Sequence, residues 1–190
     1  MTQDIRIMKT QKNIEQALIV LLNQKSFRSI TIADICEEAL TSRSTFYLHY
    51  LDKYDLLEKI ISRLTEQFEK VVKKRIHALF QHHLKNSLIE FYNEMEKKKD
   101  IIQILFKVTE PDYDLKQKYK DIIFNYWKEY LDSLDKETQV STELIATIGT
   151  SIVMDILDWT LTHGVDQVAL SYAEDLHQSI LSCMMDKKFT

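Results

Sequence analysis

The densest group of side chains suited to binding chemistry lies at residues 42–45, with the sequence Ser-Arg-Ser-Thr. The hydroxyl side chains are short enough to let the backbone approach a ligand closely. Arg43 has the charge and the reach for a phosphate or for the edge of a guanine. Tyr47 could offer its hydroxyl to a phosphate. These residue types favour a surface that holds a nucleic acid.

The pattern expected of a catalytic or metal site is missing. His82 and His83 are adjacent, so on a helix they would point about 100° apart, and they lack the i, i+4 spacing of a metal pair. Cys36 and Cys183 each lie in an apolar helical pattern, which favours buried free thiols over a disulfide or a metal site. We therefore predict no catalytic residue, no metal site and no cofactor. An enzyme with a helical fold is kept only as the least favoured hypothesis.

The elements that would position the polar run follow a helical pattern. An amphipathic helix is expected over about residues 5–24, because its apolar side chains recur at the i, i+3, i+4 spacing. A second helix begins at Thr31. The Thr31 hydroxyl could accept from the backbone N–H of Asp34 while the Asp34 carboxylate reaches back, as in a capping box.

Ser42 is the expected N-cap of a third helix that ends near Tyr50. A fourth, long helix opens at Asp52, with Asp55 three residues on, and reaches Phe80. Three short helices with a tight turn between the second and the third fit a helix-turn-helix. In that motif the third helix enters the major groove of duplex DNA and its first residues reach the base edges.

The rest of the chain predicts further helices at about residues 83–98, 100–108, 112–134, 142–163 and 171–187. The 190 residues contain only two glycines and one proline, which is too little turn chemistry for a sheet protein. We therefore expect an all-α fold of about nine helices. Gly164 is expected to end the helix before it with a positive φ.

The charge is unevenly distributed. The formal net charge is −4, but residues 1–53 carry seven basic and six acidic side chains, whereas the remainder carries 18 basic and 23 acidic ones. Any polyanion-binding surface is therefore expected in the first quarter of the chain. We expect no secretory signal, and no apolar run that approaches the length of a bilayer span, and therefore no membrane association and a cytoplasmic location.

The segment 31–57, TIADICEEALTSRSTFYLHYLDKYDLL, resembles the signature of the TetR/AcrR family of bacterial transcriptional regulators, and the match covers about residues 9–60. In that family a Thr-led helix ends at Ala-Gly-Val-Ser and is followed by a Thr-aromatic-Tyr core and a Ser/Asp-Lys step. Leu40 and Thr41 stand where Gly-Val is usual. Because leucine disfavours positive φ, we expect a turn of different shape here.

The resemblance implies a repressor that binds a palindromic operator in double-stranded DNA as a dimer and is released by a small molecule. Residues 1–52 would form the DNA-binding domain and residues 53–190 the regulatory and dimerisation domain. The matching DNA-contacting residues are Thr31, Ser42, Arg43, Ser44, Thr45, Tyr47, His49 and Lys53. Ala33 stands where arginine is frequent. Tyr47 could instead pack the core, as we expect of Tyr50 and Phe46; His49 could cap a helix, and Thr31 is first of all a cap.

The last two predicted helices carry apolar stripes that suggest a homodimer interface, a four-helix bundle formed with a second subunit. Gly149, inside the first stripe, would let a partner helix approach closely. By resemblance, a ligand pocket lies among the later helices and takes an unknown effector. Its expected aromatic lining is Phe68, Phe91, Phe106, Tyr119, Trp127 and Trp159. Two other interpretations stay open: these aromatic residues are plain core, and the protein has no pocket and is controlled by a protein coregulator.

Overall fold

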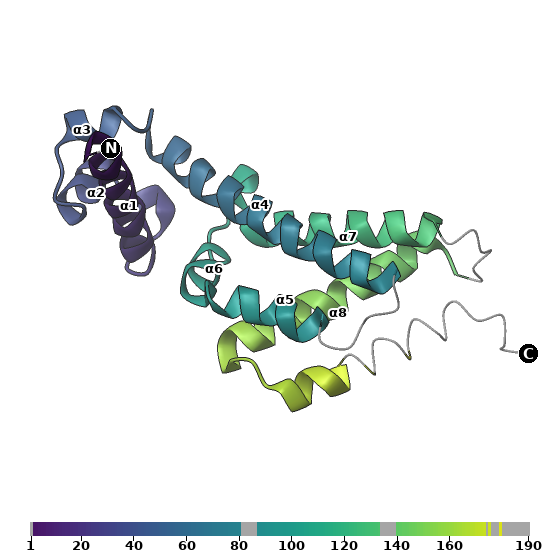
Figure 1. The fold of residues 1–190 in the computed structure, drawn as a ribbon. Helices are drawn as coiled ribbons and strands as arrows, with labels where there is room; N and C mark the ends of the chain where they lie inside the picture. The colour runs from purple at the N-terminus through teal and green to yellow at the C-terminus, as the bar shows by residue number, and fades with distance from the viewer. Residues whose placement is uncertain (1, 81–86, 134–139, 174, 176–178, 180–190) are drawn as a thin grey trace, which may run out of the picture. The chain divides into compact units, whose positions relative to one another are not determined.

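The computed structural model describes residues 2–80, 87–133, 140–173, 175 and 179, and every element within them is helical (Figure 1). The all-α prediction is therefore confirmed. The helices are α1 (Thr2–Leu22), α2 (Ile32–Glu38), α3 (Arg43–Tyr47), α4 (Lys53–Phe80), α5 (Ser87–Glu96), α6 (Lys99–Leu105), α7 (Leu115–Ser133) and α8 (Thr142–His163), with 3-10 turns η1 (Phe27–Ser29) and η2 (Pro111–Tyr113).

The chain forms two compact units, and the boundary between them falls inside α4. Unit 1 comprises residues 1–66 and 100–115, and unit 2 comprises residues 67–99 and 116–190. The predicted division into residues 1–52 and 53–190 stays a prediction; residue 53 is the first residue of α4.

The core of unit 1 is built from the inward faces of α1 to α4. Ile14 and Leu18 of α1, Ile35 of α2, Phe46 of α3 and Leu56 of α4 are all fully buried. Their spacing along each helix is the amphipathic pattern seen in the sequence, so burial of this apolar stripe accounts for the packing of these short helices.

A second stretch of chain completes unit 1. Arg28, in η1, donates from Nε to Oε1 of Glu110 at 2.8 Å. Tyr54, in the first turn of α4, packs its ring against that of Tyr113 in η2, with 5.8 Å between ring centroids. The segment 100–115 thus contacts both the η1 turn and the start of α4.

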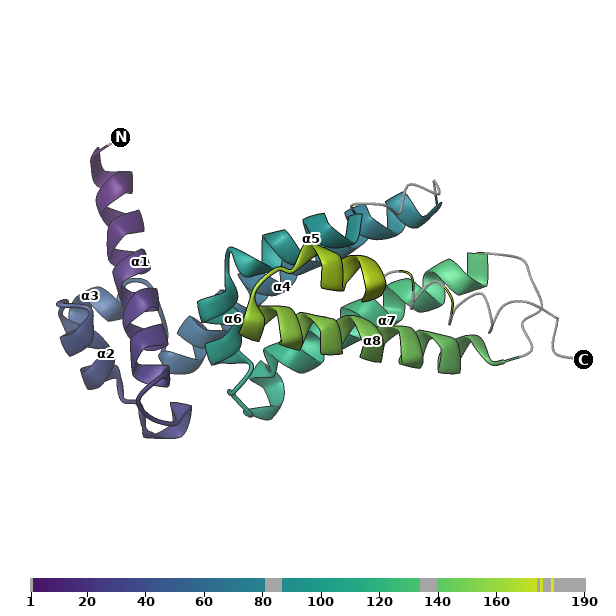
Figure 2. The ribbon, with the colours of Figure 1, turned by 90° about the horizontal axis from the view of Figure 1, so that it is seen from below.

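Unit 2 is a helical bundle of the C-terminal part of α4 with α5, α7 and α8. Figure 2 shows α7 and α8 running side by side. The buried hydroxyl of Tyr92 on α5 donates to the carbonyl of Val153 on α8 at 3.1 Å, and Lys116 on α7 pairs with Asp158 on α8. These contacts fix α8 against both neighbours.

Gly149 does permit a close approach, but its neighbour belongs to the same chain. A Cβ placed on Gly149 would meet the indole of Trp127, on α7, at 3.0 Å. The prediction that Gly149 admits a partner subunit was therefore wrong: α7 occupies that position. Gly164 has the predicted positive φ, at 87°, with ψ of 174°, a combination that is essentially restricted to glycine.

Several helix ends differ from those predicted. α3 ends at Tyr47 rather than near Tyr50. Residues 167–173 are helical, four residues ahead of the predicted start at 171, because Asp166 Oδ1 accepts from the backbone N–H groups of Val168 and Ala169. Most of the predicted helix 171–187, and His82, His83 and Cys183, lie outside the described residues.

α8 corrects the expectation that no apolar run approaches bilayer length. Its 22 residues contain a window with a mean hydropathy of 1.5, which is enough to span a membrane by length and composition alone. Half of that window is buried within the protein. One side of α8 therefore packs in the bundle of unit 2.

Candidate nucleic-acid interface

The start of α3 is organised by the hydroxyl of Ser42. As predicted, Ser42 is the N-cap, and its Oγ accepts from the backbone N–H of Thr45 at 3.1 Å. The same oxygen lies 2.8 Å from the hydroxyl oxygens of both Ser44 and Thr45. Ser42, Arg43 and Ser44 are exposed. The structure therefore brings three of the predicted contact residues, Ser42, Ser44 and Thr45, together in one hydrogen-bonded group at the start of α3.

The two faces of α3 have opposite character. Phe46 is fully buried and Tyr50 nearly so, which confirms that both belong to the core. Tyr47, by contrast, is 56% exposed, and its ring stands edge-on to Phe46 at 5.6 Å. Tyr47 thus rests on the core and presents its other edge to solvent, beside exposed Arg43.

A hydrogen bond and an ion pair link Tyr50, which follows α3, to α1 and α4. Tyr50 Oη donates to Glu15 Oε1 at 3.5 Å, and Arg63 of α4 donates to both oxygens of the Glu15 carboxylate, at 2.6 and 2.8 Å. Burial and the Glu15 charge raise the pKa of Tyr50 above its usual value, so the phenol stays neutral. His49, beside Tyr50, is half-buried.

The turn between α2 and α3 is a Schellman motif. The N–H of Thr41 donates to the carbonyl of Cys36, and the N–H of Leu40 donates to that of Glu37. Leu40 occupies the left-handed position, with φ of 50°. The expectation of a differently shaped turn was therefore wrong, because leucine adopts the conformation that glycine usually supplies.

Thr31 opens α2 with the predicted capping box. Its hydroxyl accepts from the N–H of Asp34 at 3.2 Å, and its own N–H donates to Asp34 Oδ2 at 2.8 Å. Lys25 also donates to Asp34 Oδ2, at 2.8 Å. These donors lower the pKa of Asp34 to about 2, and the hydrogen bond from Lys25 has the largest effect. The Thr31 side chain is exposed, so its capping role leaves it accessible at the surface.

Lys53 lies at the first turn of α4, where its ammonium contacts the protein's own backbone. Nζ donates to the carbonyls of Phe27, Arg28 and Ile30 at 2.9, 3.0 and 2.7 Å. It also lies 4.8 Å from the Phe27 ring centroid. Partial burial lowers the pKa of Lys53. The sequence did not predict this role, because its partners come from a turn more than twenty residues away.

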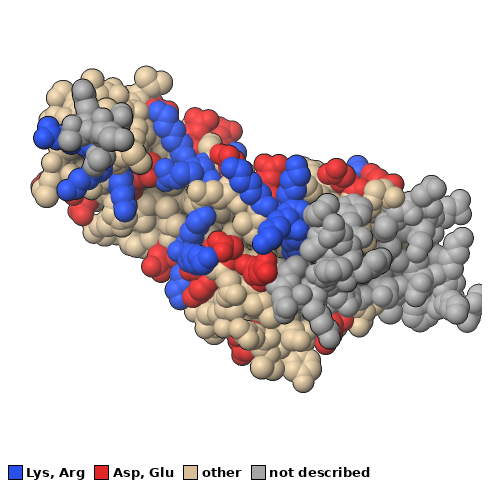
Figure 3. Space-filling view, viewed as in Figure 1, with Lys and Arg blue, Asp and Glu red and all other residues tan. Residues whose placement is uncertain are grey.

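Three exposed leucines on or next to α3 are not among the predicted contact residues. Leu40, Leu48 and Leu51 are 94%, 81% and 82% exposed. Helical periodicity could have identified Leu48, because Phe46 and Tyr50 occupy the buried side of the helix. Figure 3 shows lysine and arginine side chains over α1–α3 among mostly uncharged atoms.

The predicted ligand residues of unit 2 are only partly brought together. Phe68 of α4 stacks on Tyr119 of α7, with ring centroids 3.6 Å apart, and lies 5.7 Å from Phe91 of α5. All three are buried. Trp127 packs on Gly149, and Trp159 is partly exposed on α8, stacked on His163. Phe106, half-buried, belongs to unit 1.

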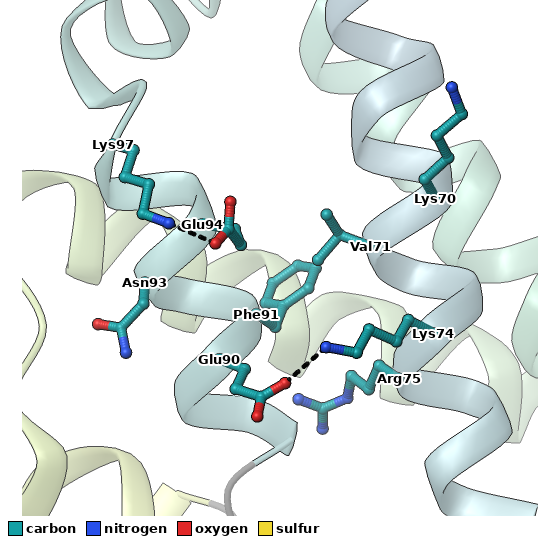
Figure 4. A pocket seen from close by; sticks show the side chains of 9 residues that line it. All are labelled: Lys70, Val71, Lys74, Arg75, Glu90, Phe91, Asn93, Glu94 and Lys97. Atoms are coloured by element: carbon teal, nitrogen blue, oxygen red, sulfur yellow. Dashed lines mark hydrogen bonds and ion pairs between the residues drawn. The ribbon is translucent and has the colours of Figure 1, made fainter.

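A cleft of about 900 Å³ lies between α4 and α5, next to this aromatic cluster. Phe91 is the only one of the predicted ligand residues that lines it. The other lining side chains are mainly charged, as Figure 4 shows, and Lys74 pairs across the cleft with Glu90 at 2.9 Å. Arg75 is buried, with its guanidinium carbon 5.9 Å from the Phe91 ring centroid.

Comparison with known proteins identifies relatives of both the motif and the fold. Residues 14–60 match the family described as bacterial regulatory proteins, tetR family. A Bacillus subtilis (strain 168) protein named as the uncharacterized HTH-type transcriptional regulator YvkB is 29% identical over 142 residues, 74% of this chain and 68% of that protein.

Two solved structures show the same fold over nearly the whole chain. A TetR transcriptional regulator from Streptococcus agalactiae 2603V is 24% identical, with a TM-score of 0.64, over 93% of this chain and 98% of that one. NalD, the secondary repressor of the MexAB-OprM multidrug efflux pump in Pseudomonas aeruginosa, is 14% identical, with a TM-score of 0.66. The match covers 96% of this chain and 100% of the NalD chain.

Proposed function

We propose that the chain is a regulator of the tetR family, whose model matches residues 14–60. It would act as a cytoplasmic repressor that binds a palindromic operator as a homodimer until a small molecule releases it. The observation that carries the DNA-binding part is the polar, exposed side of α3. Ser42, Arg43, Ser44 and Tyr47 are held there by a buried Phe46 and Tyr50. A rigid helix with an exposed hydrogen-bonding face is what major-groove recognition requires.

The homodimer is proposed on the solvent side of α8. Leu144 and Trp159 are exposed there, and Ile148, Ile152 and Ile156 between them are only partly buried. Exposed apolar stripes of this kind are typical of subunit interfaces. A two-fold pair would present two copies of α3 to half-sites about one helical turn apart, or a multiple of that, which a single copy could hold only weakly.

The effector is proposed to enter the cleft between α4 and α5. Its volume is in the range of small-molecule sites. The bound effector would favour a conformation in which the two copies of α3 are wrongly spaced for DNA, and so shift the population off the operator. The tight Phe68–Tyr119 stack, which leaves no gap between two of the expected lining residues, instead favours the alternative, a regulator controlled by a protein coregulator.

The test begins with selection of bound sequences from random duplex DNA, using the full chain. We expect a palindromic consensus. In fluorescence anisotropy on that duplex, Arg43→Ala and Tyr47→Ala should each weaken binding by about tenfold or more. Lys128→Ala, which removes an exposed cation from α7 of unit 2, is the matched control and should bind normally.

Failure to enrich any sequence would refute DNA binding, and unchanged, salt-dependent binding by both variants would refute the assignment of α3. A promoter reporter that carries the operator then decides the direction of regulation: expression should fall when the protein is present. Small molecules that raise the thermal unfolding temperature and dissociate the complex would support the effector over the coregulator.

A further inference from the structure

Leu48 is an apolar side chain in a position that the fold of the protein does not explain. It is the C-cap of α3 and keeps helical backbone angles, with φ of −70° and ψ of −20°. Four residues after Ser44 and next to Tyr47, it lies on the solvent side of the helix, opposite the buried Phe46. It is 81% exposed, so it adds almost nothing to the core.

The surroundings of Leu48 limit what it could contact. Ser44, one turn before Leu48, lies on the same side of α3, and Ser42 and Arg43 at the start of the helix are exposed as well. These groups suit the hydrogen-bonding edges of bases and phosphates, whereas a leucine can offer only methyl groups. Among the groups that base pairs present in the major groove, the apolar one is the 5-methyl of thymine.

Resting on the proposed DNA binding, we infer that Leu48 contacts the 5-methyl group of a thymine in each half-site and so selects thymine at that position. Burying one methyl group against an aliphatic side chain changes affinity by about fourfold. Two half-sites in one palindrome would multiply this to about fifteenfold.

The other exposed leucines provide matched controls. Leu40 lies in the turn before α3, where its φ of 50° sets it off the helical pattern. Leu51 follows the end of α3, and its N–H donates to Asp55 Oδ2 at 2.8 Å, so it belongs to the cap of α4. Both are as exposed as Leu48, but neither lies on the exposed face of α3.

The experiment replaces thymines of the selected operator by uracil, one symmetric pair at a time. This change deletes the methyl group and preserves base pairing. For the wild-type chain, we expect uracil at one symmetric pair of positions to weaken binding by about fifteenfold, measured by fluorescence anisotropy. Leu48→Ala should bind the thymine duplex as weakly as the wild type binds the uracil duplex, and should not distinguish the two. Leu51→Ala should retain the full discrimination.

The inference is overturned if no uracil substitution weakens wild-type binding, if Leu48→Ala still discriminates, or if Leu51→Ala loses discrimination equally. It is also overturned by a consensus without thymine. These results would leave the proposed operator binding intact, whereas a failure to select any duplex would refute the proposed function itself. Circular dichroism on both variants verifies that their helix content is unchanged.

Discussion

Leu40 is held in a conformation that leucine rarely adopts. Its φ of 50° is fixed by the two Schellman hydrogen bonds, and its side chain is 94% exposed. A left-handed non-glycine residue costs about 1–2 kcal/mol, and at this exposure the side chain recovers little by burial. The turn therefore keeps its shape at the expense of local strain.

Leu40→Gly should accordingly stabilise the chain by about 0.5–1 kcal/mol, because relief of strain exceeds the added entropy of the unfolded glycine. Urea unfolding followed by circular dichroism measures this difference. Leu40→Ala is the control: it keeps the strained φ and should leave the midpoint nearly unchanged. A lower midpoint for the glycine variant would contradict the role given to the turn.

Lys53→Met removes an ammonium that has three carbonyl partners in the η1 turn and the residue after it. We expect a loss of stability on the order of 1 kcal/mol, since these carbonyls lose the ammonium donor and the side chain is only partly buried. Operator affinity should fall too, and its salt dependence distinguishes the loss of a phosphate contact from the loss of positioning. Loss of a phosphate contact reduces the slope of log K against log salt by about one. An unchanged slope would assign Lys53 to positioning alone.

At the scale of elements, helix α2 depends on one carboxylate. Because the pKa of Asp34 in the folded chain is about 2, below its ordinary value of 3.8, the charged form stabilises the fold above about pH 4. That contribution is lost as the pH falls through about 2. Asp34→Asn keeps an acceptor for the Thr31 N–H but loses the ion pair with Lys25.

The variant should therefore have a lower urea midpoint than the wild type at pH 7, and the gap should close between about pH 4 and pH 2. Glu37→Gln, on the same helix and exposed, serves as the control and should show a smaller gap at pH 7. A gap for Asp34→Asn that persists at pH 2 would mean that the ion pair is not its cause.

Helix starts that are capped by a side chain within three residues were predictable from the sequence, whereas contacts between segments far apart in the sequence were not. Thr31 with Asp34, Ser42 with Thr45, and Asp52 with Asp55 cap their helices through side chains within three residues, so the sequence alone locates the starts of α2, α3 and α4. The end of α3 was placed too late. The N–H of His49 bonds to Phe46, three residues back, which tightens the chain as Tyr50 turns into the core.

The site itself was predictable only where one helix carries it. The N-terminal residues of α3 follow from the motif, but the carbonyl partners of Lys53 and the Arg28–Glu110 pair join segments far apart in sequence. The aromatic lining of a ligand pocket stays a prediction, for a related reason. Aromatic residues at helical spacing describe a buried face equally well whether it surrounds a cavity or, like Phe68 and Tyr119, packs on itself.

At the scale of the whole molecule, the solvent side of α8 should determine assembly. Leu144→Glu and Ile152→Glu place charges in the stripe proposed as the subunit interface, and we expect each to convert a dimer to a monomer at micromolar concentration in sedimentation velocity. Ser151→Glu, exposed beside the stripe, should remain dimeric. If the glutamate variants stay dimeric and keep the circular dichroism of the wild type, the subunit interface does not lie on this side of α8.

Unit 1 is assembled from two pieces of chain, residues 1–66 and 100–115, and the Arg28–Glu110 pair and the Tyr54–Tyr113 contact join them. The module that carries α3 is thus interrupted in the gene by the coding sequence for other structure. A hybrid regulator made by transplanting the leading segment alone would set Arg28 and Tyr54 against foreign neighbours. Engineers who graft this DNA specificity onto another sensor should transfer both pieces together.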